Sequence, residues 1–476
     1  MTETTSSATP VAAPGDWHRI FEPLAQEHDY VVDEIDGRLP EDLTGTLYRN
    51  GPGTWEQGGS PLCHLLEGDG MVSAYTLDGK SVRFRNRYVR TPAYRDGLAG
   101  LRHRTAGTLI PGGPAANADK PIAQQANTNV IEQGGQLLAF YGGALPWQLD
   151  PATLDTVGEV DYNGMLGPDR PGFSAHPKRD PESGILFNFS HTGGRAPALH
   201  TYAVHADGRG ERLGSVAVPF ADWVHDFAIT ERHFVFALAP FQYDFERFRS
   251  GAATPLDALH VHEDLGSRFV IIPKAGGPAR IIEHETFAYF HVTNAYDDGE
   301  DIVFEASIFE HGWEHANRAM FDFRTGGSDY FANRPWRYRI TPTDTVLAEP
   351  VSDIRSDWPQ LDWRQTGRQH RFSYHATTDA ATAAGGLAQI DHATGRTVVH
   401  QLPAGNVVGE PSFVPRHRRA AENDGWVLFG AYDPTRHRSR LVILDARDVG
   451  GEAVAVAHLR HHVPQTFHGS FSLAAG

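Results

Sequence analysis

Short runs with the composition of β-strands recur along most of the chain, and in many of them apolar and polar residues alternate. Two clear examples are residues 71–89 and residues 127–143. Alternation with a period of two buries one face of a strand and leaves the other in solvent. Asp78-Gly79 and Gly134-Gly135 stand inside these runs and match the chemistry of two-residue hairpin turns. The pattern predicts antiparallel strands joined by tight turns.

Helical patterns are few. Only LAQEHDY (24–30) and LDALHVHEDL (256–265) have the spacing of short helices, and we expect both in loops between strands. Residues 30–476 contain no sharp linker, which predicts one all-β domain. A sandwich rarely reaches this length, whereas propeller blades of about four strands add up to it. We therefore predict a β-propeller over residues 30–476, preceded by a disordered tail at residues 1–29.

Composition excludes several functions. The formal charge of −17 argues against nucleic acid, which requires clustered Lys and Arg against its phosphates. The N-terminus lacks the basic and apolar regions of a secretory signal, and no run approaches the ~18 apolar residues of a spanning helix. The single cysteine, Cys63, cannot form an internal disulfide, which indicates a reducing compartment. We expect a cytoplasmic monomer or weak dimer, and leave open a peripheral contact with a membrane.

Four of the 26 histidines stand among apolar or aromatic neighbours: His176, His225, His291 and His468. An unpaired imidazole in such surroundings costs free energy unless it is hydrogen-bonded or bound to a metal. Their spacings are 49, 66 and 177 residues, which approximate one, one and three propeller blades. One histidine from the innermost strand of each of four blades would converge on the central axis.

A site of four imidazoles suits Fe(II), Zn(II) or Cu(II). Structural zinc sites usually include cysteine thiolates, and none is available here. Each ligand should also donate its second ring N–H to a carboxylate or carbonyl group. The candidate carboxylates are Asp357 and Glu410, in the segments DWPQLD and GEPSFVPR.

These residues stand in segments that resemble the carotenoid cleavage oxygenase family. The matching segments follow in family order from about residue 30 to 475 and include LYRNGPG (47–53), HLLEGDGMVSAY (64–75), VHDFAIT (224–230), FHVTNAYDDG (290–299), VVGEPSFVPR (407–416) and FHGSF (467–471). The resemblance implies a seven-bladed propeller with a loop cap over an axial metal site. It also implies one Fe(II) per chain on the same four histidines, with no catalytic side chain beyond the metal centre. The expected reaction joins O2 to a conjugated double bond of a polyene and yields two carbonyl products.

The chain departs from the family pattern in the carboxylates that hydrogen-bond the metal-binding histidines. Members normally place three glutamates behind three of the histidines. Glu410 matches one, and the shorter Asp357 stands at the second, where we expect it to reach its histidine through water. The third position is Gly142, which leaves His225 without a carboxylate. We expect weaker iron retention than in a typical member, because such losses cost about 10–100-fold in affinity or activity.

A second departure bears on the substrate. Relatives that cleave hydroxylated stilbenes and phenylpropanoids commonly carry a lysine just before the third glutamate, and here that residue is Tyr141. Tyr94 matches their other phenol-binding residue, but a tyrosine at a single position is a common match and carries less weight than the missing lysine. The resemblance therefore favours an apocarotenoid over a phenol. Adjacency to the ligands predicts that Tyr141, Phe173, Trp223 and Phe467 line an apolar tunnel.

Three alternatives remain open at this stage. A stilbene or phenylpropanoid dioxygenase would take a small phenol, and a retinoid-type isomerohydrolase would use the same fold and metal without consuming oxygen. A propeller that only binds a partner would hold no metal. The segment from His311 to His315 also matches the H-x-x-E-H pattern of inverted zinc proteases, but it follows a strand-like run and contains a glycine, which argues against the required helix.

Overall fold

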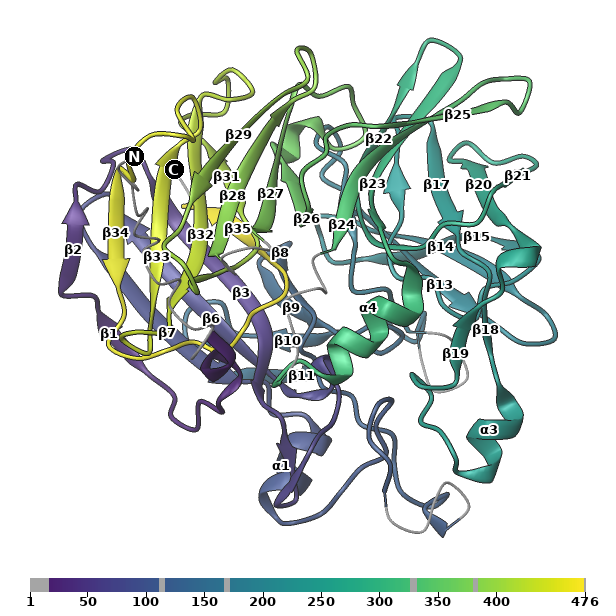
Figure 1. The fold of residues 1–476 in the computed structure, drawn as a ribbon, viewed down its shortest axis with the longest axis horizontal. Helices are drawn as coiled ribbons and strands as arrows, with labels where there is room; N and C mark the ends of the chain where they lie inside the picture. Colours follow the sequence, from purple (N-terminus) through teal and green to yellow (C-terminus); the bar gives the residue numbers. More distant parts are fainter. Residues whose placement is uncertain (1–16, 111–115, 167–171, 326–331, 380–383, 475–476) are drawn as a thin grey trace, which may run out of the picture.

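The computed structural model describes residues 17–110, 116–166, 172–325, 332–379 and 384–474. In these residues, seven antiparallel sheets of four or more strands are arranged as the blades of a propeller (Figure 1). The strands that contact one another around the centre include β8, β16, β22, β26, β31 and β35. The predicted all-β propeller is confirmed, with the seven blades that the family resemblance implied.

The blades follow one another along the chain. The first is β1 (Asp29–Val31), β7 (Val82–Tyr88), β6 (Asp69–Asp78), β3 (Thr44–Thr54) and β35 (Gly469–Leu473), and the second is β8 (Asn129–Gln133), β9 (Gln136–Phe140), β10 (Trp147–Leu149) and β11 (Thr156–Glu159). The third is β12 (Lys178–Arg179), β13 (Leu186–Thr192), β14 (Ala198–Val204) and β15 (Gly210–Ala217). The fourth is β16 (Ala228–Ile229), β17 (His233–Leu238), β20 (Ser267–Pro273) and β21 (Arg280–His284).

The remaining three blades come from the C-terminal half and the N-terminal strand β2. The fifth is β22 (Tyr289–Asp298), β23 (Asp301–Phe309), β24 (Asn333–Ile340) and β25 (Val346–Pro350). The sixth is β26 (Ser356–Leu361), β27 (Phe372–Asp379), β28 (Ala384–Asp391) and β29 (Arg396–Gln401). The seventh is β2 (Glu34–Gly37), β34 (Ala455–His458), β33 (Arg438–Asp445), β32 (Gly425–Asp433), β30 (Val407–Val408) and β31 (Ser412–Pro415).

Strands from both ends of the chain close the ring. The C-terminal β35 pairs with β3 in the first blade, and the N-terminal β2 pairs with β34 in the seventh. Each of these two blades therefore contains strands from opposite ends of the sequence. This pairing also brings His468, which directly precedes β35, to the centre of the ring.

The hairpin predictions are confirmed. Strand β6 turns into β7 through Gly79 and Lys80, one residue beyond the predicted pair, and β8 turns into β9 through Gly134 and Gly135. Gly79, Gly134 and Gly135 all have positive φ, which glycine adopts without strain. In β7 the side chains alternate between buried and less buried positions, as the sequence pattern predicted.

The two predicted short helices are wrong. Residues 24–28 have no regular structure and β1 begins at Asp29, while residues 256–265 contain β19 (Leu259–Val261) and the 3-10 turn η3 (Glu263–Leu265). Strand β19 pairs with β18 (Phe241–Tyr243), so pairing with a distant segment overrides the local helical spacing. Conversely, residues 312–321, which we expected not to be helical, form helix α4 (Gly312–Phe321).

The boundary of the predicted tail also changes. Residues 1–16 lie outside the described residues, but residues 17–29 are part of the packed structure. The 3-10 turn η1 (Trp17–Phe21) buries Trp17, Ile20 and Phe21 in the largest hydrophobic cluster of the described chain. Burial of these three side chains offsets the cost of ordering the segment. That residues 30–476 fold as a single domain remains a prediction.

A layer of connections covers one side of the propeller. It contains α1 (Pro92–Leu98), α3 (Phe245–Ser250), α4 and the β18–β19 hairpin, which Figure 1 shows in the lower part of the view. The small hairpin β4 (Glu56–Gln57) and β5 (Ser60–Pro61) and the turns η2 (Leu65–Glu67) and η5 (Trp363–Gln365) are further elements of the described residues. None of the helices in the described part of the chain is both long and apolar enough to span a membrane.

Candidate metal centre

Four histidines from different blades meet at the centre of the propeller. His291 lies in β22, and His176, His225 and His468 lie just before β12, β16 and β35. The strands that carry or follow His176, His225, His291 and His468 belong, in that order, to the third, fourth, fifth and first blades. The sequence spacings therefore correspond to one, one and three blades. One ring nitrogen from each histidine lies within 4.8 Å of the other three, and the Nε2 atoms of His176 and His225 are 3.0 Å apart.

The electrostatics of the cluster favour neutral imidazoles. Burial, followed by the neighbouring imidazoles of the cluster, holds the pKa values of His176, His225 and His291 well below the usual range for histidine. Neutral rings keep a lone pair, which is the form that binds a metal ion. Four convergent imidazole nitrogens without thiolates fit a borderline divalent ion, so this donor set is compatible with iron.

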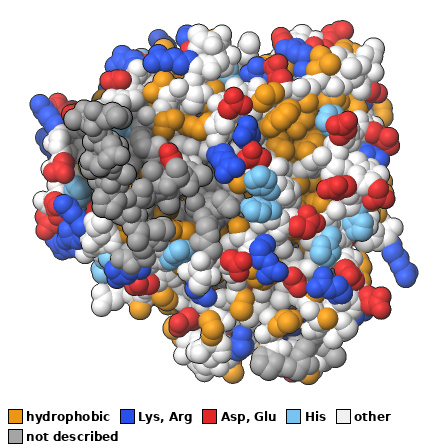
Figure 2. Space-filling model, in the orientation of Figure 1, with side chains coloured by type: hydrophobic (Ala, Val, Ile, Leu, Met, Phe, Trp, Pro, Cys, Tyr) orange, Lys and Arg blue, Asp and Glu red, His pale blue; other side chains and the backbone are white. Residues whose placement is uncertain are grey.

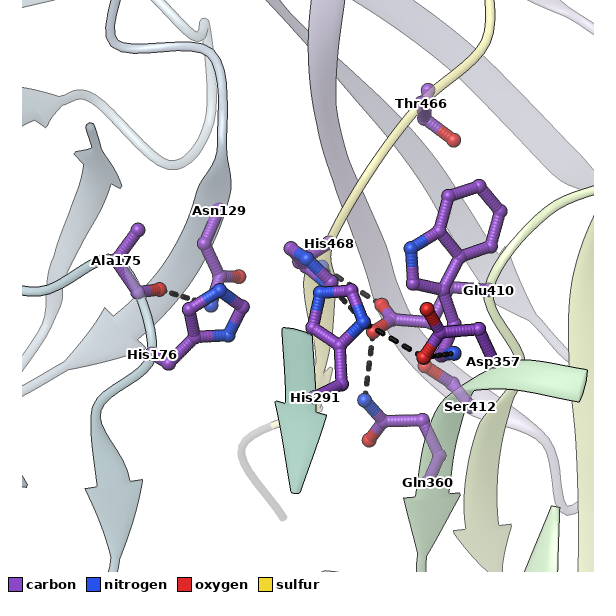
Figure 3. A network of polar contacts seen from close by, with 12 residues as sticks. Asn129, Ala175, His176, His291, Asp357, Gln360, Glu410, Ser412, Thr466 and His468 are labelled. Carbon is purple, nitrogen blue, oxygen red and sulfur yellow. Dashed lines mark hydrogen bonds and ion pairs between the residues drawn. The ribbon is translucent and has the colours of Figure 1, made fainter. Parts of the chain in front are cut away.

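The orientation of His468 is set by a buried ion pair. Its Nδ1 donates to Glu410 Oε1 at 2.8 Å, and Arg49 Nη1 donates to Glu410 Oε2 at 2.7 Å. A carboxylate accepts, so Nδ1 carries the ring hydrogen and Nε2 presents its lone pair to the cluster. Gln360 donates a further hydrogen bond of 2.8 Å to Glu410 Oε1 (Figure 3). Glu410 therefore acts on the cluster through His468, and the sequence did not reveal its partners Arg49 and Gln360.

The orientation of His291 is set by Asp357. His291 Nδ1 lies 2.9 Å from Asp357 Oδ1, and Asn333 Nδ2 donates to Asp357 Oδ2 at 2.7 Å. The expectation that the shorter aspartate would need a bridging water is wrong. The register of β26 shifts between Asp357 and Gln360, and this irregularity turns the aspartate directly toward His291 (Figure 3). Trp358, inside the irregularity, has a φ of 49°, which bulky residues rarely adopt.

The two carboxylates differ in their electrostatic support. Burial raises the pKa of Asp357 to about 7, although hydrogen bonds from Trp358 and Asn333 act in the opposite direction. Burial acts in the same direction on Glu410, but the interaction with His468, which includes its hydrogen bond, and the charge of Arg49 outweigh it and hold its pKa below the usual value. The two pKa values shift in opposite directions because Glu410 is paired with the charged Arg49, whereas Asp357 is hydrogen-bonded by the uncharged Asn333.

The third carboxylate of the family pattern is absent from position 142. Gly142 follows β9, and the next residue donates its backbone N–H to the Phe173 carbonyl at 2.9 Å. Ser174 in turn donates to the His225 carbonyl at 3.1 Å, so the two segments adjoin. A Cβ built on Gly142 would meet no atom within 4 Å, and its φ is not positive. The position therefore has room for a side chain.

We predict that Gly142→Glu binds iron about 10-fold more tightly than the natural chain, because a carboxylate there would orient His225. Iron retention during dialysis against a weak chelator measures the effect. Gly142→Gln has the same size without the charge and serves as the control. Equal retention by both variants would show that no carboxylate is needed at this position.

Aromatic side chains surround one side of the cluster. Trp223 stacks on His225 with ring centroids 6.4 Å apart, and Phe290 lies 4.7 Å from the same ring. Trp313 of α4 packs on both Trp223 and Phe290, at 5.3 and 5.9 Å. The sequence predicted Trp223 as a site residue because it is close to His225 in the chain. It missed Trp313, because only the fold brings α4 over the site.

The other predicted tunnel residues lie in different surroundings. Phe173 is buried between Tyr162 and Tyr202 in the core of the second and third blades, and Phe467 is buried in the large cluster that contains Trp313. Tyr141 lines an apolar cavity of about 160 Å³ together with residues of the segment 104–123 and of α3. That any of the four contacts substrate remains a prediction.

A second, larger cavity also reaches the histidine cluster. It has a volume of about 500 Å³ and is lined by His176, His291 and His468. Lys178 and Asp226, which also line it, form an ion pair of 2.8 Å. The cluster is therefore reached by a cavity of mixed polar and apolar lining on one side and lies against aromatic side chains on another.

Comparison with known proteins agrees with the fold and the site. The family model of the retinal pigment epithelial membrane protein matches residues 21–473. The apocarotenoid-15,15'-oxygenase of Synechocystis sp. is 32% identical, over 97% of this chain and 96% of that protein. The isoeugenol monooxygenase of Pseudomonas nitroreducens is 28% identical, over 94% and 95%. A solved structure of cobalt-substituted Synechocystis ACO matches with a TM-score of 0.89 at 31% identity, over 97% of this chain and 99% of that one.

The fold and the site together define a seven-bladed β-propeller with an axial cluster of four histidines that could hold a metal ion. The chain belongs to the carotenoid cleavage oxygenase family, to which the retinal pigment epithelial membrane protein also belongs.

Proposed function

We propose that this protein is an Fe(II)-dependent dioxygenase that cleaves a conjugated double bond of an apocarotenoid. The observation that carries the proposal is the convergence of four imidazoles on the propeller axis. His176, His225, His291 and His468 would hold one Fe(II) per chain. When bound, the iron supplies the activation of O2 that no side chain of this site provides.

The residues of the chain orient the metal ligands and exclude water. Glu410 and Asp357 fix the rings of His468 and His291, so these ligands are positioned before any metal binds. Trp223 and Phe290 form an apolar wall beside His225. Such a wall favours an apolar polyene beside the metal and keeps bulk water away from a reacting double bond.

The apolar lining of the cavity at Tyr141 supports an apolar substrate. Nearby segments expose large apolar side chains, including Leu98 of α1 (74% exposed), Leu101, Ile122 (68%) and Phe245 of α3. Figure 2 shows apolar side chains at the lower edge of the molecule, where Figure 1 places α1 and α3. Exposed apolar patches of this kind mark interaction sites. We propose that this face contacts a membrane peripherally and takes up the polyene there.

A phenylpropanoid is the second candidate substrate, because one relative is named an isoeugenol monooxygenase. Against it, Tyr141 stands where phenol-cleaving relatives carry a lysine. Burial raises the pKa of the Tyr141 hydroxyl, so it is a poor base for ionising a phenol. Tyr94, the other candidate phenol contact, accepts a hydrogen bond of 2.7 Å from Arg90 and stacks on Tyr88.

Oxygen uptake tests the proposal directly. Iron-loaded protein is expected to consume O2 with an apocarotenoid and to yield two carbonyl products that both carry label from ¹⁸O2. Isoeugenol and a hydroxystilbene serve as the phenol panel. Faster uptake on a phenol would replace the substrate class, and product formation without uptake would indicate an isomerohydrolase. A protein that binds iron and turns over none of these compounds would contradict the proposed activity.

A further inference from the structure

A second group of metal-ligating side chains lies away from the axis, between the fifth and sixth blades. Glu305 lies in β23, His370 precedes β27, and His392 directly follows β28. One ligand atom from each lies within 4.8 Å of the other two. The function proposed above uses none of these residues.

The distances between the ligand atoms match those around a small metal ion. Glu305 Oε2 lies 3.2 Å from His370 Nε2, and Glu305 Oε1 lies 3.5 Å from His392 Nδ1. Ligands bound at ~2.1 Å in a tetrahedron are about 3.4 Å apart. The separation in the axial cluster is similar, at 3.0 Å between two Nε2 atoms.

Two of these atoms lack a hydrogen bond. Glu305 Oε2 and His370 Nε2 have no hydrogen-bond partner among the described residues, although Glu305 is only 1% exposed and His370 only 6%. Their mutual distance of 3.2 Å permits an ion pair, but their angles do not meet the geometry of a hydrogen bond. Asn294 Nδ2 donates to His370 Nδ1 at 3.2 Å, so His370 Nε2 carries the ring hydrogen in the metal-free protein. Unpaired polar atoms at such depth cost free energy, and a cation that replaced this hydrogen would satisfy both atoms.

The third ligand presents a lone pair to the same space. Arg337 Nη2 lies 3.0 Å from His392 Nδ1, and Arg337 Nε donates to Glu305 Oε1 at 2.7 Å. A guanidinium group only donates, so Nδ1 of His392 is unprotonated. The opposite nitrogen, Nε2, lies 2.8 Å from Ser373 Oγ, which can accept its hydrogen. This is the second contact that metal-binding histidines usually make.

Arg337 occupies part of the space that a metal ion would take. Its Nη1 lies 3.5 Å from the exposed carboxylate of Glu349 on β25, and its side chain is 23% exposed. The guanidinium therefore has a second partner toward the surface. A metal ion at His392 would displace one Arg337 contact and leave Arg337 paired with Glu349.

We propose that Glu305, His370 and His392 form a second metal site, which takes a borderline divalent ion such as Zn(II) and links the fifth and sixth blades. Two imidazoles and one carboxylate are a ligand set that zinc proteins use. The three ligands come from the fifth and sixth blades, so a metal ion bound to them would join the two sheets.

Zinc titration of the iron-loaded protein tests the site. The natural chain is expected to bind about one zinc ion in addition to its iron, and its melting temperature should rise with zinc by mass action. His370→Gln and His392→Gln should lose both effects while iron content stays unchanged. His400→Gln is the matched control, because His400 lies on β29 of the same blade and bonds the Gly451 carbonyl instead. Equal zinc uptake by all four proteins would overturn the proposal.

Arg337→Met is expected to strengthen zinc binding, whereas the two histidine variants should weaken it. Removing the competing guanidinium is expected to tighten zinc binding about 10-fold, because His392 Nδ1 is then free. A hydrogen-bonded network without a metal role would instead lose stability that zinc does not restore. Anomalous scattering at the zinc edge locates the ion in the natural chain without any variant. A peak between Glu305 and His370 supports the site, and peaks found only elsewhere would overturn it.

Discussion

His291→Ala is expected to lose its iron and more than about 100-fold of its oxygen uptake together, since the loss of a ligand exceeds the 10–100-fold cost of losing a partner behind one. The substitution removes one of four convergent nitrogens and leaves Asp357 buried without its imidazole partner. Iron per chain, measured on purified protein, and oxygen uptake on an apocarotenoid report the two losses.

The control for this variant is His191→Ala. His191, which lies in the third blade, is half-buried, its Nδ1 lies 2.7 Å from the Ala221 carbonyl, and it is not one of the four clustered histidines. It should keep iron and turnover. If His291→Ala kept full activity, the assignment of the metal centre would have to be withdrawn.

Arg49→Met is expected to destabilise the protein by about 3–5 kcal/mol, because it leaves a buried carboxylate without its cation. Arg49 and Glu410 have side chains that are 4% and 1% exposed, and the Arg49 guanidinium also donates to the Glu410 carbonyl and to Ser412. Denaturant unfolding measures the loss of stability. Iron retention should fall as well, since Glu410 would no longer be held against His468.

A double variant separates the two effects of Arg49. Arg49→Met with Glu410→Gln removes the unpaired charge, so stability should recover in part while iron retention stays low. Arg436→Met is the surface control, because Arg436 is 58% exposed and should change stability by no more than about 0.5 kcal/mol. An Arg49→Met protein as stable as the natural chain would show that the ion pair contributes nothing net.

The comparison of Asp357 with Gly142 shows how far a family pattern carries. Both positions depart from the expected glutamate. At Asp357 the strand irregularity in β26 compensates for the shorter side chain, so the direct contact with His291 is kept. At Gly142 no side chain exists to be redirected. The consequence of a substitution therefore depends on the backbone that carries it, which local sequence does not report.

Local pattern misled where distant pairing decided the structure. The spacing of residues 256–265 suits a helix, yet β19 forms there because β18 lies beside it. The predicted tail extended through residues 17–29 because no strand-like run is found there. Trp17 and Phe21 are nevertheless buried, since the cap supplies a cluster that receives them.

The sequence by itself determined the strands, the propeller and the four histidines, because each depends on a short-range signal. Alternation sets a strand, Asp-Gly and Gly-Gly set its turns, and the blade length sets where each histidine meets the axis. Only the tertiary structure decided which side chains hydrogen-bond the supporting carboxylates and which aromatic rings pack beside those histidines. Arg49, Asn333 and Trp313 are distant from them in the chain, and their contacts with the site arise only when the blades and cap are assembled.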